Sequence, residues 1–126
     1  MSLLEEVGLA EKSHFAAGEL SYGQKKLLEI VRAVAMDSKL FLLDEPAAGV
    51  NRTMLNKIID LILRLRDDGR TILIIEHDMG FVMNLCERII VMDKGKEIAE
   101  GSPIQIQRNK KVLTAYLGTT NSYVAN

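Results

Sequence analysis

Two short runs of apolar residues, separated by an amphipathic segment, constrain the fold of this chain more than any other feature. The runs cover residues 40–43 and 71–75, and apolar residues recur at helical spacing over 53–66 until Gly69 ends the pattern. Short uninterrupted apolar runs are typical of strands covered on both faces, as in a parallel sheet. The sequence therefore predicts a strand, helix and strand with a right-handed crossover, which is the unit of an α/β fold.

The segments on either side predict further helices and a hairpin. Ser21 and Gln24 have the spacing of a capping box, so we expect a helix that begins there and ends near Met36. Residues 119–126 are expected to form a flexible tail. The other predicted elements are a helix over 78–85, strands over 88–93 and 97–100 joined by a tight turn at Lys94-Gly95, and two short helices from Pro103 to Leu117.

Length and composition limit the class of protein. The chain has 126 residues, 48% of them hydrophobic, and its 16 Lys and Arg nearly balance its 17 Asp and Glu, so we expect a single domain that does not bind nucleic acid. The apolar runs are far shorter than the roughly 20 residues of a membrane span, and the chain opens without a signal-peptide pattern, so we expect a cytoplasmic protein. Cys86, the single cysteine, has apolar neighbours and is expected to be a buried, inert thiol.

Two adjacent carboxylates, Asp44 and Glu45, stand at the end of the first apolar run. Open α/β sheets place ligands at the carboxyl ends of their strands. Because neighbouring side chains on a strand diverge, one carboxylate can address a metal ion while the next faces another atom, as phosphoryl transfer to water requires. Taken alone, the same residues also fit a solvated strand end before the turn at Pro46.

Several segments together resemble the ATPase subunits of ABC transporters. Residues 20–24 (Leu-Ser-Tyr-Gly-Gln) resemble the signature motif, 40–44 the Walker B strand, 49–51 the D-loop, and His77 the switch histidine. The resemblance spans about residues 3–118 and is most specific for branched-chain amino-acid importers. It implies part of a P-loop NTPase-like domain over residues 1–118, with a mostly parallel sheet flanked by helices and followed by a hairpin and helices.

The resemblance implies that the signature residues Ser21, Tyr22, Gly23 and Gln24 bind the γ-phosphate of ATP held by the opposite subunit. The N-terminus of a helix favours anions, which agrees with this role. The commonest signature has glycine where Tyr22 stands, and tyrosine does not readily adopt a positive φ. The backbone there must therefore tolerate a side chain, as in the importer subgroup, which uses such a tyrosine.

The resemblance also implies roles for residues beyond the signature. Asp44 would hold Mg²⁺ through water, Glu45 would be the general base for the attacking water, and His77 would contact the γ-phosphate and sense its loss. A histidine after a strand can also be a merely solvated side chain. Asn51 stands where the D-loop usually has aspartate, and it keeps the capping capacity of that residue without the charge.

No stretch of the chain fits the P-loop pattern of Gly, four residues, Gly-Lys and Ser or Thr. We therefore expect a fragment that does not bind ATP tightly alone, with ATP and Mg²⁺ present only in the complete domain or with a partner that carries a P-loop. In the family the P-loop strand lies between the strand before His77 and the strand at 89–92. Its absence predicts a gap in the sheet, which the chain closes by rearranging or by pairing strand edges with a second copy.

Three functions are compatible with the sequence. The first is an ATP-hydrolysing subunit that pairs with a second ATPase subunit and with membrane permease subunits at the inner face of the cell membrane, and drives branched-chain amino-acid import. The second is a catalytically silent module that offers its signature helix and D-loop to a partner. The third is an ABC-type ATPase acting on DNA ends or ribosomes, although such proteins usually carry long coiled coils or a tandem domain that these residues lack.

Overall fold

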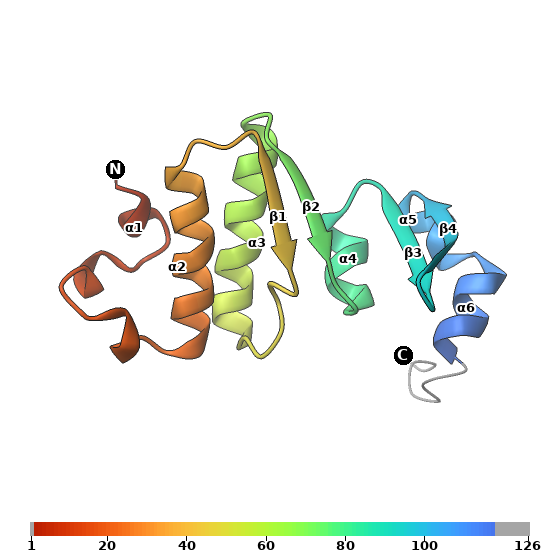
Figure 1. Cartoon of the computed structure of the whole chain (residues 1–126), viewed down its shortest axis with the longest axis horizontal. Helices are drawn as coiled ribbons and strands as arrows, with labels where there is room; N and C mark the ends of the chain where they lie inside the picture. The colour runs from red at the N-terminus through yellow and green to blue at the C-terminus, as the bar shows by residue number, and fades with distance from the viewer. Residues whose placement is uncertain (1, 118–126) are drawn as a thin grey trace. The chain divides into compact units, whose positions relative to one another are not determined.

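The computed structural model describes residues 2–117, which divide after Asp78 into two compact units (Figure 1). The first unit contains α1 (Leu3–Glu6), the 3-10 helices η1 (Ala10–Lys12) and η2 (Ala17–Glu19), α2 (Tyr22–Ala35), β1 (Leu40–Asp44), α3 (Arg52–Asp67) and β2 (Thr71–Ile75). The second unit contains α4 (Met79–Leu85), β3 (Ile89–Asp93), β4 (Lys96–Gly101), α5 (Pro103–Gln107) and α6 (Lys110–Leu117). The tail predicted at residues 119–126 lies outside the described residues.

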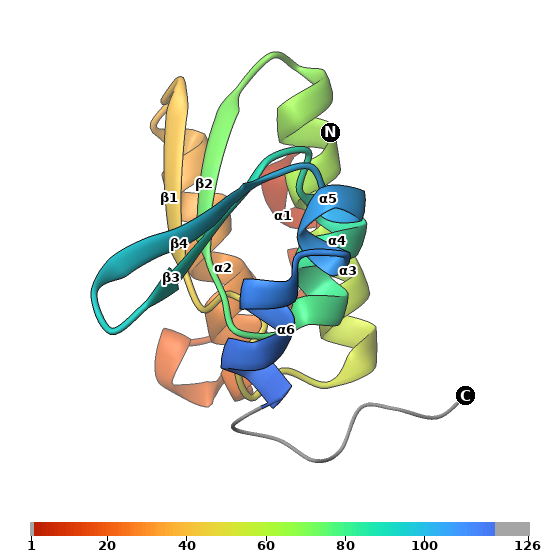
Figure 2. The same ribbon diagram turned by 90° about the vertical axis from the view of Figure 1, so that its right-hand side faces the viewer.

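The first unit confirms the predicted strand, helix and strand. β1 and β2 pair in parallel, with Leu42 opposite Leu73, and they run side by side in the view of Figure 2. Helices α2 and α3 pack against each other, and α3 packs against β2. Leu27 of α2 and Ile58 of α3 have 0% of their surface exposed, so they lie at the centre of this unit's core.

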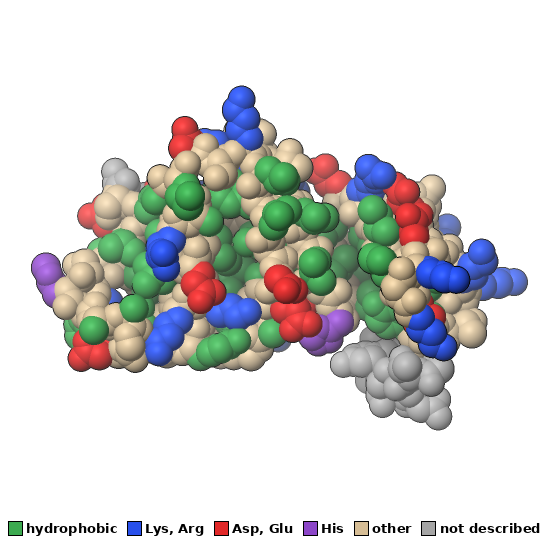
Figure 3. Space-filling model, viewed as in Figure 1, with side chains coloured by type: hydrophobic (Ala, Val, Ile, Leu, Met, Phe, Trp, Pro, Cys, Tyr) green, Lys and Arg blue, Asp and Glu red, His purple; other side chains and the backbone are tan. Residues whose placement is uncertain are grey.

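One face of the β1–β2 sheet is exposed, which corrects the expectation that both strands are covered on both faces. Phe41 is 4% exposed while the next residue, Leu42, is 68% exposed. An unbroken apolar run shows that both faces of a strand are apolar, but it does not show what covers each face. Hydrophobic side chains accordingly gather over β1 and β2 in Figure 3. The exposed side chains, which we call the open face, are Leu40, Leu42, Leu73 and Ile75.

The helix ends in the first unit follow the capping signals of the sequence. α2 begins after Ser21, which forms the predicted capping box with Gln24, and ends at its C-cap, Met36. α3 ends before Gly69, whose φ of 79° is the left-handed conformation that glycine adopts readily after a helix. The local sequence therefore determines where both long helices start and stop.

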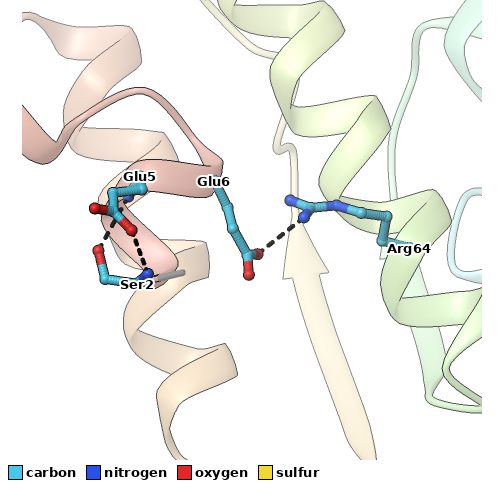
Figure 4. Close-up of polar contacts among 4 residues, drawn as sticks. All are labelled: Ser2, Glu5, Glu6 and Arg64. Carbon is cyan, nitrogen blue, oxygen red and sulfur yellow. Dashed lines mark hydrogen bonds and ion pairs between the residues drawn. The ribbon is translucent and has the colours of Figure 1, made fainter.

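The N-terminal helix α1 is held by a capping box and by an ion pair (Figure 4). Ser2 N–H donates to the Glu5 carboxylate at 2.6 Å, and Glu5 N–H donates to Ser2 Oγ at 3.3 Å. Arg64 of α3 donates to the carboxylate of Glu6 at 2.9 Å. Because the Arg64 and Glu6 side chains are partly exposed, this pair contributes at most about 1 kcal/mol to stability.

The second unit contains the predicted hairpin and helices. β3 and β4 pair antiparallel in a two-stranded sheet of their own. Pro103 occupies the first turn of α5, after the N-cap Ser102. The core of this unit consists of Ile89, Val91, Ala99, Ile106 and Val112.

The turn between β3 and β4 provides a test of hairpin stability. Lys94 and Gly95 have φ values of 49° and 75°, as a type I′ turn requires, and asparagine is favoured over lysine at the first of these positions. We expect Lys94→Asn to raise the free energy of unfolding by roughly 0.5–1 kcal/mol in urea titrations, because asparagine tolerates this conformation better. Lys94→Gln, which removes the same charge, is the control, and an equal gain in both variants would contradict the turn argument.

Candidate functional site

The parallel pairing of β1 and β2 brings two of the predicted site residues together. Asp44 lies opposite Ile75, so both strands end at the same edge of the sheet. Just beyond this edge, His77 Nδ1 lies 3.4 Å from Glu45 Oε1. The two side chains are exposed, 74% for His77 and 51% for Glu45, so a ligand can reach both. The arrangement presents a carboxylate and an imidazole side by side.

Glu45 has an unusual backbone conformation. Its φ of 45° lies in the left-handed region, which costs a residue other than glycine about 1–3 kcal/mol and persists only where surrounding contacts offset that cost. Three hydrogen bonds fix this backbone. Glu45 N–H donates to the Ile75 carbonyl at 2.9 Å, and the Glu45 carbonyl accepts from Lys26 Nζ at 2.7 Å and from Ala48 N–H at 3.2 Å. The first bond comes from the adjacent strand, the second from helix α2 and the third from the turn itself.

The carboxylate of Glu76 ties the end of β2 to the turn after β1. Its Oε1 accepts from the Ala47 N–H at 2.8 Å, and its Oε2 accepts from the His77 N–H at 3.2 Å. Hydrogen bonds to a charged acceptor are stronger than those between neutral groups. Glu76 therefore links the backbone beside His77 to the backbone beside Glu45.

The signature residues form the N-terminus of α2, a helix of 14 residues. Gln24 N–H donates to Ser21 Oγ at 3.3 Å, and Ser21 N–H donates to Gln24 Oε1 at 3.0 Å. Tyr22 is the first helical residue and is not among the residues with positive φ, which confirms that the backbone there tolerates a side chain. Since the first turn of a helix leaves N–H groups without helical partners, this end suits an anion.

Two glycines allow close contacts around the signature. A Cβ at Gly23 would lie 3.0 Å from Met54 Cγ, so any larger residue here would require the Met54 side chain to shift. Gly49 has a φ of 68°, and a Cβ there would lie 3.1 Å from Cε1 of Tyr22. The Tyr22 ring thus packs on the turn before Asn51, which caps α3 by accepting from Met54 N–H at 2.9 Å.

The donor set at this edge is compatible with Mg²⁺ only if other oxygens complete the shell. Asp44 is exposed at the end of β1, and Mg²⁺ in phosphoryl-transfer sites is typically bound by one or two carboxylates, substrate phosphate and water. Within the described part of the chain, no group of three or more His, Cys, Asp and Glu side chains is placed to hold a metal ion. Asp44 therefore fits an ion that also binds phosphate oxygens and water.

Cys86 lies outside this site, in the second unit. It is half-buried against the core of that unit, and so less buried than predicted, and this partial burial raises the pKa of its thiol. Because the thiolate is the reactive form, we expect Cys86 at pH 8 to react with iodoacetamide several-fold more slowly than free cysteine. The rate should rise as the pH increases above 9. Mass spectrometry of the intact chain measures this rate, and alkylation at the rate of free cysteine would contradict an inert thiol.

Lys26 and Glu76 contact the site, although no role was expected for either residue. Lys26 belongs to the polar side of an amphipathic helix, where lysine is ordinarily solvated. Glu76 stands next to His77 in sequence, which is a weak signal, since its contact with Ala47 depends on the pairing of β1 with β2. Only the three-dimensional arrangement reveals what both side chains bind.

The fold and this edge of the sheet are those of part of an ATP-binding cassette of the ABC transporter type. An ATP-binding cassette of an ABC transporter in its ADP conformation is similar to this chain, with a TM-score of 0.81 and 38% sequence identity, over 92% of this chain and 47% of that structure. A nucleotide-free ATP-binding cassette gives the same TM-score and identity over 90% of this chain. The predicted fold class is therefore confirmed.

Comparisons of the amino-acid sequence agree with this structural similarity. Residues 1–48 match the ABC transporter family, and residues 96–120 match the family of branched-chain amino acid ATP-binding cassette transporters. Over 116 residues, or 91% of this chain, the identity is 44% to the high-affinity branched-chain amino acid transport ATP-binding protein BraF of Pseudomonas aeruginosa and 43% to LivG of Escherichia coli. The chain belongs to the family of ABC transporter ATP-binding proteins, and it spans about half the length of these relatives (46%).

Proposed function

We propose that this chain is the C-terminal half of an ATP-hydrolysing subunit that powers the import of branched-chain amino acids. The observation that supports it most is the pair of Glu45 and His77, 3.4 Å apart beyond the carboxyl ends of parallel strands. The substrate class is supported by the relatives, which are named as branched-chain amino acid transport proteins. These names favour import over the DNA-end and ribosome alternatives.

In this proposal each polar group at the sheet edge has a separate task. Asp44 would hold Mg²⁺ through water, and the ion would neutralise charge on the phosphates. Glu45 would accept a proton from the attacking water. His77, in contact with the Glu45 carboxylate, would donate a hydrogen bond to the γ-phosphate.

The signature end of α2 would serve a different nucleotide. Ser21, Tyr22, Gly23 and Gln24 would bind the γ-phosphate of ATP held by a second ATPase subunit, because the helix N-terminus favours an anion. Asn51, which caps α3 next to the Tyr22 contact, would connect the two sites. Both subunits would act with permease subunits at the cytoplasmic face of the membrane. Among residues 2–117, the longest helix has 16 residues, and no helix has the length and apolar character of a membrane span.

The 126 residues alone are expected to be inactive, because no P-loop is present to hold ATP. The test joins this chain in one polypeptide to the P-loop-bearing first half of a BraF-type relative. We call this chimaera the complete subunit and expect it to hydrolyse ATP, while the chain alone does not. If the complete subunit folds and binds ATP but releases no phosphate, the proposal is wrong.

A second candidate function is a silent interaction module, favoured by the open face and by the absence of a P-loop. Because β1 and β2 pair only with each other among the described residues, their outer edges are also unpaired. Such surfaces recruit other chains, so the isolated chain is expected to self-associate in sedimentation experiments at increasing concentration. The module is tested with a full-length relative whose own signature motif has been inactivated. ATP hydrolysis by that relative should return when this chain is added. It should not return when the added chain carries Ser21→Arg.

A further inference from the structure

Two side chains outside the family motifs bind the same short stretch of backbone, residues 45–47. Lys26 reaches it from helix α2, and Glu76 reaches it from the end of β2. We propose that Lys26 and Glu76 are positioning residues that hold Glu45 in its left-handed conformation, with its carboxylate beside His77. The effect of these residues on catalysis rests on the proposed function, whereas their effect on the conformation of Glu45 does not.

Lys26 acts on the carbonyl group of Glu45. Its Nζ donates to that oxygen at 2.7 Å, from a position in the second turn of α2. Rotation of the Glu45 backbone to a negative φ changes the direction of the neighbouring peptide groups, so a donor fixed on a helix opposes that rotation. The Lys26 ammonium also lies 5.9 Å from the centre of the Tyr22 ring, which helps to keep the long side chain in place. The contact therefore connects the signature helix to the backbone of the proposed base.

Glu76 acts from the opposite side of the turn. One carboxylate oxygen accepts from Ala47 N–H and the other from His77 N–H, at 2.8 and 3.2 Å. This bridge fixes the backbone two residues after Glu45 relative to the backbone of His77. It therefore restrains the separation of the two groups whose side chains meet at 3.4 Å.

The two contacts are complementary. Lys26 adds a side-chain donor to the Glu45 carbonyl, which also accepts from Ala48 N–H at 3.2 Å within the turn. The Glu45 N–H is bound to the Ile75 carbonyl at 2.9 Å, so both peptide groups of this residue are fixed. Glu76 then fixes the turn that follows. A left-handed glutamate persists only where its surroundings over-determine it, and these side-chain and main-chain contacts together supply that restraint.

The first test uses the 126-residue chain without nucleotide. A residue with positive φ gives a strong intraresidue NOE between its amide proton and Hα, so this signal at Glu45 reports the conformation directly. We expect Lys26→Met to weaken it strongly, while Lys26→Arg, which keeps a donor, restores it. Lys25→Met is the matched control, because Lys25 is an exposed neighbour on the same helix. An unchanged NOE in Lys26→Met would overturn the role of Lys26.

The second test concerns Glu76 and uses amide hydrogen exchange in the same chain. We expect Glu76→Ala to speed exchange at Ala47 by roughly tenfold or more, because its acceptor is lost. Glu76→Gln keeps one oxygen acceptor, so it should preserve protection from exchange at only one of the two amides, that of Ala47 or that of His77. This variant keeps the test valid if Glu76→Ala does not fold. The proposed bridge would be overturned if exchange at Ala47 were unchanged in Glu76→Ala and exchange at both amides were unchanged in Glu76→Gln.

Measurements of ATPase activity then distinguish a positioning role from a general effect on the stability of the protein. In the complete subunit we expect Lys26→Met to lower kcat by roughly 10- to 100-fold with little change in KM for ATP, because misplacement of a catalytic group affects the chemical step. Lys26→Arg should recover most of the rate. An unchanged kcat in Lys26→Met would overturn the positioning role. If the unsubstituted subunit is inactive while the NOE and exchange results hold, the proposed function fails and the conformational role of both residues remains.

Discussion

In the complete subunit, Glu45→Gln is expected to lower ATP turnover by at least about 100-fold while ATP still binds. Glutamine has nearly the same shape, so the backbone contacts with Ile75 and Lys26 can persist. The amide cannot accept a proton from water, so only the proton-transfer step is lost. Phosphate release measures the turnover, and calorimetry on the same preparation measures ATP binding.

Glu11→Gln provides the matched control for this experiment. Glu11 is an exposed carboxylate of the first unit, in the 3-10 helix η1. We expect its replacement to leave turnover unchanged. Strong residual hydrolysis in Glu45→Gln, with Glu11→Gln also active, would remove Glu45 as the base and leave His77 as the remaining candidate at this edge.

The second large effect concerns stability. Leu27→Ala is expected to lower the free energy of unfolding by about 2–5 kcal/mol, because Leu27 is 0% exposed and its removal leaves a cavity between α2 and the rest of the core. Proteins have only about 5–15 kcal/mol of stability in total, so this loss is expected to leave the first unit close to unfolding. Urea titration followed by circular dichroism measures the change.

Leu42→Ala makes the same chemical change on the open face. Because Leu42 is 68% exposed, we expect it to cost no more than about 0.5 kcal/mol in dilute solution. Comparable losses in Leu27→Ala and Leu42→Ala would show that the open face is covered in solution. A loss that grows with protein concentration would assign the cover to a second copy, and a loss independent of concentration would assign it to a rearrangement of the chain.

The local features of the fold were predictable because each depends on residues close in sequence. Ser21 with Gln24 determines the start of α2, and Gly69 determines the end of α3, by capping that needs no distant partner. The hairpin turn at Lys94-Gly95 likewise follows from two adjacent residues. The exposure of Leu42 was not predictable, since an apolar residue carries no information about which neighbour covers it.

Candidate site residues could be named from the sequence, but their geometry could not. The sequence indicated Asp44, Glu45 and His77 because their positions after apolar runs are visible along the chain. Their proximity depends on the register of β1 with β2, and the left-handed backbone of Glu45 has no signal in residue type, since glutamate ordinarily avoids it. The contact of Lys26 was not predictable either, because helical periodicity distinguishes the faces of a helix and not the contacts of a long side chain.

The packing of the Tyr22 ring on Gly49 has a consequence for how this family varies. With tyrosine at position 22, any side chain at 49 meets the ring at about 3 Å in addition to the strain of a left-handed backbone. With glycine at position 22, only the backbone strain would remain, and asparagine or aspartate could then occupy position 49 at moderate cost. The two positions should therefore change together among homologues, and the residue at 22 should predict how strictly glycine is kept at 49.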